Sequence, residues 1–215
     1  MIEIQNLKKE FSLNRQQKKN LGIAHSKVTA VDEINLTCWP GRIFSLLGPN
    51  GAGKTTTLRL IATILQPTSG TIKVNGLNTR QEGQKVRSSI GFLTGTTGLY
   101  DRLTPDELVT YFGKLNGMDN TKLKKRKQEL FHTLEIVSFV GKKIGELSTG
   151  MKQKVSIART MIHDPQVVVF DEPTAGLDVI TAENIIDLIR QCKEDGKTVI
   201  FSSHIMSEVD LLCDD

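Results

Sequence analysis

The stretch Gly48-Pro49-Asn50-Gly51-Ala52-Gly53-Lys54-Thr55 decides how this chain folds. A short apolar run, 42–47, precedes it, and the apolar residues of 58–65 recur with helical spacing. A strand, a glycine-rich turn and a helix in this order let successive backbone N–H groups face an anion at the helix N-terminus. The lysine then reaches the terminal phosphates, and the threonine hydroxyl ligates magnesium. The stretch therefore predicts a nucleotide-binding loop in an α/β fold.

A glycine-rich turn without a ligand is the alternative, but such a turn does not need Lys54 and Thr55 directly after its last glycine. We assign Lys54 both to phosphate binding and to catalysis. The residues expected to contact the nucleotide phosphates are Gly48, Pro49, Asn50, Gly51, Ala52, Gly53, Lys54, Thr55 and Thr56.

A second apolar run, 167–170, ends in two adjacent acids, Asp171 and Glu172. A continuous apolar run is typical of a strand buried on both faces, and ligands bind at the carboxyl ends of such strands. We expect Asp171 to support magnesium, directly or through water, as Thr55 does. Glu172 is expected to orient and deprotonate the water that attacks the nucleotide. Two solvated acids, the alternative, would not explain why they close an apolar strand.

Composition predicts one compact α/β domain. The chain has 215 residues, is 38% hydrophobic and 24% charged, and contains no run near the ~18 apolar residues that span a bilayer. The N-terminal segment 1–5 lacks a basic start followed by an apolar core, so we expect no signal peptide and a cytosolic location. Three widely spaced cysteines argue against a zinc site and a disulfide framework.

Charge does not indicate a nucleic-acid partner. The net charge is +4, and the basic runs are 15–19 and 122–127. An apolar stripe at helical spacing follows the second run, which favours a solvated helix face. Aromatic residues make up 5% of the chain, so few side chains could stack on bases.

The strand pattern is interrupted between the two phosphate-site motifs. Thr104, Pro105 and Glu107 predict a capped helix start, and a helical stretch runs from there to roughly Val137. A helical subdomain of about 95–160 is therefore expected inside an α/β core. Strands are predicted at 2–7, 28–37, 43–47, 71–75, 89–93, 167–171 and 198–202.

The pattern Leu147-Ser148-x-Gly150-x-x-Gln153 resembles the signature sequence of ATP-binding cassette (ABC) proteins. Ser148 and Gly150 precede an amphipathic helix, where hydroxyl and backbone donors can meet an anion. Taken alone, the pattern would favour a merely capped helix. Because the pattern lies shortly before the acidic pair Asp171-Glu172, we interpret it as the family signature.

Two further features follow in the family's order, and a third, Phe11, lies near the start of the chain. The segment 173–178, ending in Asp178, resembles the loop that touches the opposite subunit, and His204 resembles the switch histidine that contacts the γ-phosphate. Phe11 falls where the family places an aromatic residue that stacks on adenine, with core packing as a rival interpretation. The remaining histidines, His25, His132 and His163, read as ordinary polar surface or core residues.

One position departs from the family. Members usually carry a Pro-Gln pair after the strand 90–93, and here the pair would fall on Thr94-Gly95. The family glutamine helps to hold magnesium and water and links the site to the membrane partner. Glycine at position 95 has no side chain for these contacts, so the resemblance does not imply normal coupling between the ATP site and the membrane partner. A hydroxyl of Thr94, Thr96 or Thr97 could substitute for the missing glutamine.

The resemblance covers essentially the whole chain and is greatest to ATP-binding subunits of two-component bacterial exporters. It implies a P-loop NTPase core with a mixed sheet, an N-terminal antiparallel β subdomain and an inserted helical subdomain, within a single nucleotide-binding domain, 1–215. It also implies a homodimer that binds ATP and Mg²⁺ and hydrolyses ATP at the inner face of the cell membrane. The partner would be a separate integral membrane permease subunit, and the exported species would be sodium or another small solute.

Two alternatives belong to other classes. Soluble cassette ATPases of DNA repair, chromosome maintenance or translation usually carry a long coiled coil between the motifs or two cassettes in one chain, and this chain has neither. Kinases and small GTPases share the glycine-rich loop but have no use for Leu147-Ser148-Thr149-Gly150. Family members also normally continue beyond the segment 211–215 with at least one more strand, so the resemblance implies a truncated cassette whose C-terminal strands are missing.

Overall fold

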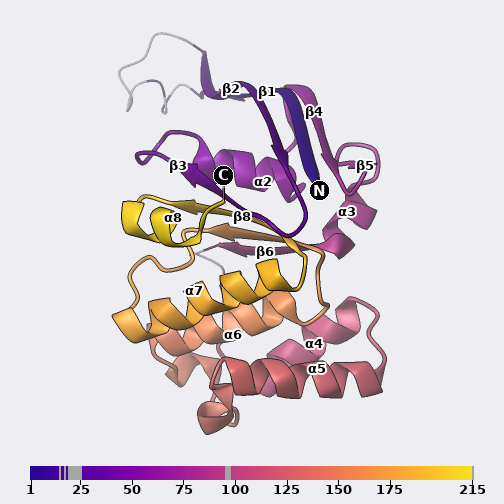
Figure 1. The fold of residues 1–215 in the computed structure, drawn as a ribbon, viewed down its shortest axis with the longest axis vertical. Coiled ribbons are helices and arrows are strands. Elements are labelled where there is room, and N and C mark those ends of the chain that lie inside the picture. Colours follow the sequence, from indigo (N-terminus) through magenta and orange to yellow (C-terminus); the bar gives the residue numbers. More distant parts are fainter. Residues whose placement is uncertain (15, 17, 19–25, 95–97, 215) are drawn as a thin grey trace.

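The computed structural model describes residues 1–14, 16, 18, 26–94 and 98–214. Its strands form two separate four-stranded sheets (Figure 1). The first sheet is antiparallel and has the order β2-β1-β4-β5. Its strands are β1 (Ile2–Ser12), β2 (Lys27–Cys38), β4 (Ser69–Val74) and β5 (Leu77–Asn78). The predicted N-terminal antiparallel β subdomain is confirmed.

The second sheet is parallel and has the order β3-β8-β7-β6. Its strands are β3 (Ile43–Leu47), β6 (Ile90–Thr94), β7 (Val167–Asp171) and β8 (Thr198–Ser203). Every residue of β7 and β8 is buried, as their continuous apolar runs predict. Alternate β7 residues face two different cores: Val167 and Val169 pack in one, and Val168 and Phe170 in the other.

The first core lies between the two sheets. Helix α2 (Lys54–Ile61) packs there against strands of both sheets, with Leu58, Leu60 and Ile61 fully buried (Figure 1). Helix α3 (Gly83–Ser89) follows β5 and leads into β6. The second core joins the opposite face of the parallel sheet to the helices α7 (Val179–Glu194) and α8 (Met206–Leu212) and to the helical subdomain.

The helices between β6 and β7 confirm an inserted helical layer. They are α4 (Pro105–Leu115), α5 (Asn120–Thr133), the 3₁₀ turns η1 (Ile136–Phe139) and η2 (Ile144–Glu146), and α6 (Thr149–Met161). The predicted stretch from Thr104 to Val137 is divided into separate helices. Gly117 has a φ of 75° after the end of α4, and Asp119 caps α5 by accepting bonds from the N–H groups of Thr121 and Lys122.

The capping box at the start of α4 is present as predicted. The Thr104 hydroxyl accepts a bond from the Glu107 N–H at 3.3 Å, and the Glu107 carboxylate accepts one from the Thr104 N–H at 2.8 Å. Within the described residues, none of the helices is both long enough and apolar enough to cross a bilayer.

Within the described part of the chain, β3 lies at one end of the parallel sheet, next to β8. The segment after α8 reaches this edge. The N–H of Ile43 donates to the Asp214 carboxylate at 2.9 Å, and the N–H of Asp214 donates to the Ile43 carbonyl at 3.0 Å. The additional C-terminal strand implied by the resemblance stays a prediction.

Candidate functional site

The glycine-rich loop connects the end of β3 to the first residue of α2, as its sequence predicts. It borders a pocket of about 140 Å³ that also touches β2 and the end of β7. The lining residues are Ala30, Asn50, Gly51, Ala52, Gly53, Lys54, Thr55, Thr56 and Glu172. Residues from both predicted motifs thus share one pocket.

Gly53 allows the loop to lie directly against β2. Its φ is 88°, and a Cβ at this position would lie 2.2 Å from the carbonyl oxygen of Ala30. A residue with a side chain would therefore displace either the loop or β2. The glycine keeps the backbone N–H groups at the start of α2 open toward the pocket.

Lys54 is the first residue of α2, and its side chain is buried. The ammonium donates hydrogen bonds to the carbonyls of Gly48, at 2.6 Å, and Pro49, at 3.1 Å. It thus lies over the loop that is expected to bind phosphates. The first turn of α2 contains no acidic residue, so the positive end of the helix dipole reinforces this charge.

Thr55 and Asp171 are 116 residues apart in the sequence and in contact in the fold. The Thr55 hydroxyl donates to the Asp171 carboxylate at 2.9 Å, and the Ser202 hydroxyl donates to the same oxygen at 2.8 Å. Asp171 is buried at the carboxyl end of β7, beside the ends of β6 and β8. Two motifs that the sequence suggested separately therefore form one site.

The oxygen atoms of Thr55 and Asp171 suit Mg²⁺, which prefers oxygen ligands and few protein groups. The described residues contain no cluster of three or more His, Cys, Asp or Glu side chains that could bind a metal by itself. Magnesium at this place would therefore need phosphate oxygens and water as its remaining ligands, which is its usual arrangement in nucleotide sites.

Glu172 has an unusual backbone conformation. Its φ is 50°, and its N–H donates both to the Ser202 carbonyl, at 3.2 Å, and to the Ser202 hydroxyl, at 3.1 Å. A left-handed conformation costs a non-glycine residue roughly 1–2 kcal/mol, and such strain clusters at functional sites. The carboxylate lines the phosphate pocket and lies 3.4 Å from Nδ1 of His204. The structure thus brings His204 beside the predicted base.

The signature residues lie elsewhere in the same chain. Ser148 is exposed and caps α6 by accepting a bond from the Met151 N–H at 3.3 Å. A Cβ on Gly150 would lie 3.6 Å from the Asp178 carboxylate, so the signature packs on the loop before α7. None of Ser148, Gly150 and Asp178 is among the residues that line the phosphate pocket.

Asp178 caps α7. Its carboxylate accepts bonds from the Thr181 N–H, at 3.0 Å, and from the Thr181 hydroxyl, at 2.8 Å. These two bonds hold the pKa of Asp178 below its ordinary value, so the group is a fixed negative charge at neutral pH. Gln153 of the signature also donates to the Pro173 carbonyl at 2.9 Å, which ties α6 to the loop after Glu172.

Phe11 lies on β1, is 37% exposed, and belongs to neither core, so the rival interpretation of core packing is wrong. The ammonium of Lys9 lies 5.1 Å from its ring centre. Gly95, Thr96 and Thr97, the positions at which the family glutamine is missing or replaced, lie outside the described residues, as does His25.

Two further residues support the site, and the motifs did not identify them. Ser202 bonds both Asp171 and Glu172, and Glu208 of α8 bonds Thr174, in the loop after β7, and Ser203, at the end of β8. The paired serines at 202–203 end a buried apolar strand, as the paired acids do, and this similarity could have identified Ser202. The contacts of Glu208 have no comparable local pattern.

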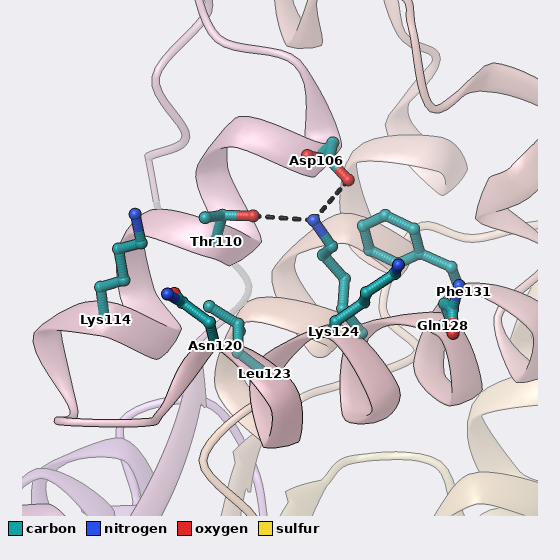
Figure 2. A pocket seen from close by; sticks show the side chains of 9 residues that line it. Asp106, Thr110, Lys114, Asn120, Leu123, Lys124, Gln128 and Phe131 are labelled. Atoms are coloured by element: carbon teal, nitrogen blue, oxygen red, sulfur yellow. Dashed lines mark hydrogen bonds and ion pairs between the residues drawn. The ribbon is translucent and has the colours of Figure 1, made fainter.

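A larger hollow of about 410 Å³ lies between α4 and α5 (Figure 2), and no residue of the phosphate loop lines it. Lys127, one of the lining residues, donates to the Thr110 hydroxyl at 2.9 Å and pairs with Asp106 at 2.6 Å. None of the predicted site residues lines it. The ion pair joins helices α4 and α5 of the subdomain, and we assign it a structural role.

The fold and the phosphate site together define a P-loop nucleotide-binding protein. Residues 31–175 match the family model described as ABC transporter, and the chain belongs to this family. It is therefore an ATP-binding ATPase domain of the ABC type. Membership excludes the kinase and GTPase alternative, and the comparisons give no support to the alternative in DNA repair or translation.

Similar sequences include several ATP-binding proteins. The chain is 45% identical to the ABC transporter ATP-binding protein NatA of Bacillus subtilis (strain 168), over 87% of this chain and 76% of that protein. It is 36% identical to the linearmycin resistance ATP-binding protein LnrL of the same organism, over 92% of this chain and 64% of that protein. It is 33% identical to the Nod factor export ATP-binding protein I of Cupriavidus metallidurans, over 92% of this chain and 65% of that protein. The chain thus spans less than two thirds of the length of the last two relatives.

Similar solved structures are also ABC cassettes. A dimeric post-hydrolysis state of the ATP-binding cassette MJ0796 bound to ADP and Pi matches with a TM-score of 0.86 at 28% identity, covering 99% of this chain and 91% of that one. An ATP-binding subunit of an ABC transporter matches with a TM-score of 0.84 at 24% identity, covering 100% of this chain and 83% of that one, and supports the fold alone.

Proposed function

We propose that this chain powers export by hydrolysing ATP in a homodimer attached to a separate integral membrane permease subunit. The observation that carries the ATP-hydrolysing part of the proposal is the 2.9 Å hydrogen bond between Thr55 and Asp171. It places the phosphate loop against the acidic pair at the carboxyl end of β7. This arrangement can bind a nucleotide and activate water beside its terminal phosphate.

In the proposed mechanism the phosphates contact the residues from Gly48 to Thr56, and Lys54 moves from the loop carbonyls to the terminal phosphates. Thr55 and Asp171 would hold Mg²⁺, and a bound Mg²⁺ would supply positive charge against the phosphate oxygens. Glu172 accepts a proton from the attacking water. His204, whose Nδ1 lies 3.4 Å from the Glu172 carboxylate, contacts the γ-phosphate in this proposal.

The signature residues serve the partner copy in this proposal. Ser148, Gly150 and Asp178 are grouped on one surface but do not line the pocket of their own chain. Val179 and Ile180, next to Asp178, are more than 70% exposed, which suits a surface that another protein covers. Each ATP would then lie between the phosphate loop of one chain and the signature of the other, with Phe11 against the adenine.

The proposed place of action is the inner face of the cell membrane. The names of two relatives refer to export or resistance, which supports an exporter. The solute is proposed to be sodium or another small solute, on the basis of the resemblance to ATP-binding subunits of two-component bacterial exporters. The helices between β6 and β7 form the helical subdomain that we place at about 95–160 of one nucleotide-binding domain. No nucleic-acid partner is proposed.

Lys54→Ala tests the nucleotide site. Loss of a charge-assisted bond of about 1.5–3 kcal/mol predicts ATP binding that is about 10- to 100-fold weaker, measured by equilibrium titration with a fluorescent ATP analogue. The matched control is Lys73→Ala, because Lys73 is an exposed lysine on β4 that does not line the pocket. Equal affinities of the two variants would contradict the assignment of the site.

Capture of the tagged chain from detergent-solubilised membranes tests the proposed partner. We expect recovery of an integral membrane protein that depends on the intact chain. Recovery of ribosomes or DNA in place of a membrane protein would contradict the transport proposal while leaving the ATPase assignment unaffected.

A further inference from the structure

Glu208 is a buried carboxylate on the first turn of α8. It is 8% exposed, and it accepts two short hydrogen bonds, from the Thr174 hydroxyl at 2.6 Å and from the Ser203 hydroxyl at 2.7 Å. Among the described residues, no lysine, arginine or histidine forms an ion pair with it. An acid buried without a cation is tolerated when its hydrogen bonds are well made, and these two bonds fix the carboxylate between Thr174 and Ser203.

The two hydroxyls belong to two different segments of the site: Thr174 lies in the loop after β7, and Ser203 is the last residue of β8. Thr174 follows Glu172 by two residues, and Ser203 directly precedes His204. Ser203 also accepts a bond from the N–H of Ile205 at 3.0 Å, so its hydroxyl connects the backbone after His204 to Glu208. One carboxylate thereby joins the loop of the predicted base to the loop of the predicted switch histidine.

The loop around Thr174 is itself well ordered by short-range bonds. The Ala175 N–H donates to the Glu172 carbonyl at 3.3 Å, and the Leu177 N–H donates to the Thr174 carbonyl at 3.2 Å. A displacement of Thr174 would therefore move Glu172, whose left-handed backbone is held from the other side by Ser202. The position of Glu172 depends on restraints from both sides.

We propose that Glu208 is a positioning residue that holds the Glu172 loop and the His204 loop in the geometry needed for hydrolysis. The inference rests on the proposed function, because it takes Glu172 as the base. It assigns to α8 a role in the rate of hydrolysis, although Glu208 does not line the phosphate pocket. Glu208 should accordingly affect turnover and leave ATP binding, which the loop of α2 provides, nearly unchanged.

Three variants of the full chain test the proposal in an ATPase assay with Mg²⁺. Glu208→Ala removes both bonds, and we expect kcat to fall by about 10- to 100-fold with KM within about threefold of wild type, because small misplacements of reacting groups are costly. Glu208→Gln should recover at least a third of the wild-type kcat, since an amide can accept from one hydroxyl and donate to the other. Asp210→Ala is the matched control, because Asp210 is an exposed acid on the same helix, and it should retain wild-type kcat.

A double-mutant cycle with His204→Ala supplies a readout that a purely structural role would not change. Because Glu208 holds the loops of both His204 and Glu172, adding Glu208→Ala to His204→Ala should lower kcat further, but by clearly less than Glu208→Ala lowers it in the wild-type chain. Independent, multiplying losses would overturn the proposal. If Glu208→Ala does not fold, Thr174→Val and Ser203→Ala each remove one of the two bonds and should lower kcat with KM retained.

A Glu208→Ala protein that is folded and turns over within twofold of wild type would overturn the inference. The same result would leave the proposed function intact, provided that Glu172→Gln still slows hydrolysis. Wild-type turnover by Glu172→Gln would instead contradict the proposed function itself, so the two failures are distinguishable.

Discussion

Gly53 is the residue at which the phosphate loop and the antiparallel sheet come closest. Ala30 of β2 lines the phosphate pocket, and its carbonyl oxygen occupies the space that a Cβ on residue 53 would need. The N-terminal sheet is therefore part of the nucleotide site as well as a cover for α2. The glycine is required by this contact in addition to its positive φ.

Gly53→Ala should therefore be more destabilising than an alanine at another glycine of positive φ. Gly76→Ala is the matched control, since Gly76 has a φ of 78° and a Cβ added there would point into open space. We expect about 1–2 kcal/mol of strain in both variants and about 1–3 kcal/mol more in Gly53→Ala from overpacking. Each kcal/mol lowers the midpoint of thermal unfolding by about 2–4 °C for a domain of this size. Equal midpoints for the two variants would contradict the close approach of β2.

The residues that are expected to bind and hydrolyse the nucleotide could largely be predicted from the sequence. The residues that hold them in position could not. Lys54, Thr55, Asp171 and Glu172 follow strands or begin a helix, so their meeting is a consequence of local pattern and of parallel-strand geometry. The contacts of Glu208 depend on how α8 packs against two loops, and no local spacing encodes that packing. Polar residues that act through tertiary contacts are for this reason the ones that the pattern missed.

The start of α4 shows what the sequence can establish at the scale of an element. Thr104, Pro105 and Glu107 predict the capping box, and the structure contains both of its bonds. The break between α4 and α5 could not be predicted in the same way, because apolar residues continue at helical spacing on both sides of it. Those residues serve two helices that pack closely: a Cβ on Gly113 would lie 2.3 Å from a methyl carbon of Leu123.

The capping box predicts a pH-dependent contribution to stability. Hydrogen bonds from the backbone and the hydroxyl of Thr104 lower the pKa of Glu107 below its ordinary value. A lowered folded-state pKa means that the contribution is present above the unfolded-state pKa and is lost as the pH falls through the folded-state pKa. Glu107→Gln should thus unfold at a lower denaturant concentration than wild type near neutral pH, with the difference vanishing as the pH falls below the folded-state pKa of Glu107.

The matched control for this prediction is Glu183→Gln, because Glu183 is an exposed acid on α7. Its unfolding midpoint should follow that of wild type across the same pH range. A difference between Glu107→Gln and wild type that stays constant over this range would show that the carboxylate charge does not stabilise α4.

At the scale of the whole molecule, the site is divided between two surfaces. The phosphate loop, Asp171, Glu172 and His204 meet at one end of the parallel sheet, and the signature residues lie outside that pocket together with Asp178. The α/β class, the antiparallel subdomain and the helical insertion could be predicted from motif order. Separation of the strands into two sheets could not, because it depends on the packing of both faces of β7 and on α2 between the sheets.

Two copies of this chain are proposed to close around ATP, after which Glu172 starts hydrolysis. Sizing chromatography of Glu172→Gln with ATP and Mg²⁺, paired with its hydrolysis rate, tests this proposal most directly. We predict a rate about 10²–10⁴-fold below that of wild type and an ATP-dependent shift from monomer to dimer. A Glu172→Gln protein that hydrolyses ATP at the wild-type rate and elutes as a monomer with ATP would contradict the account.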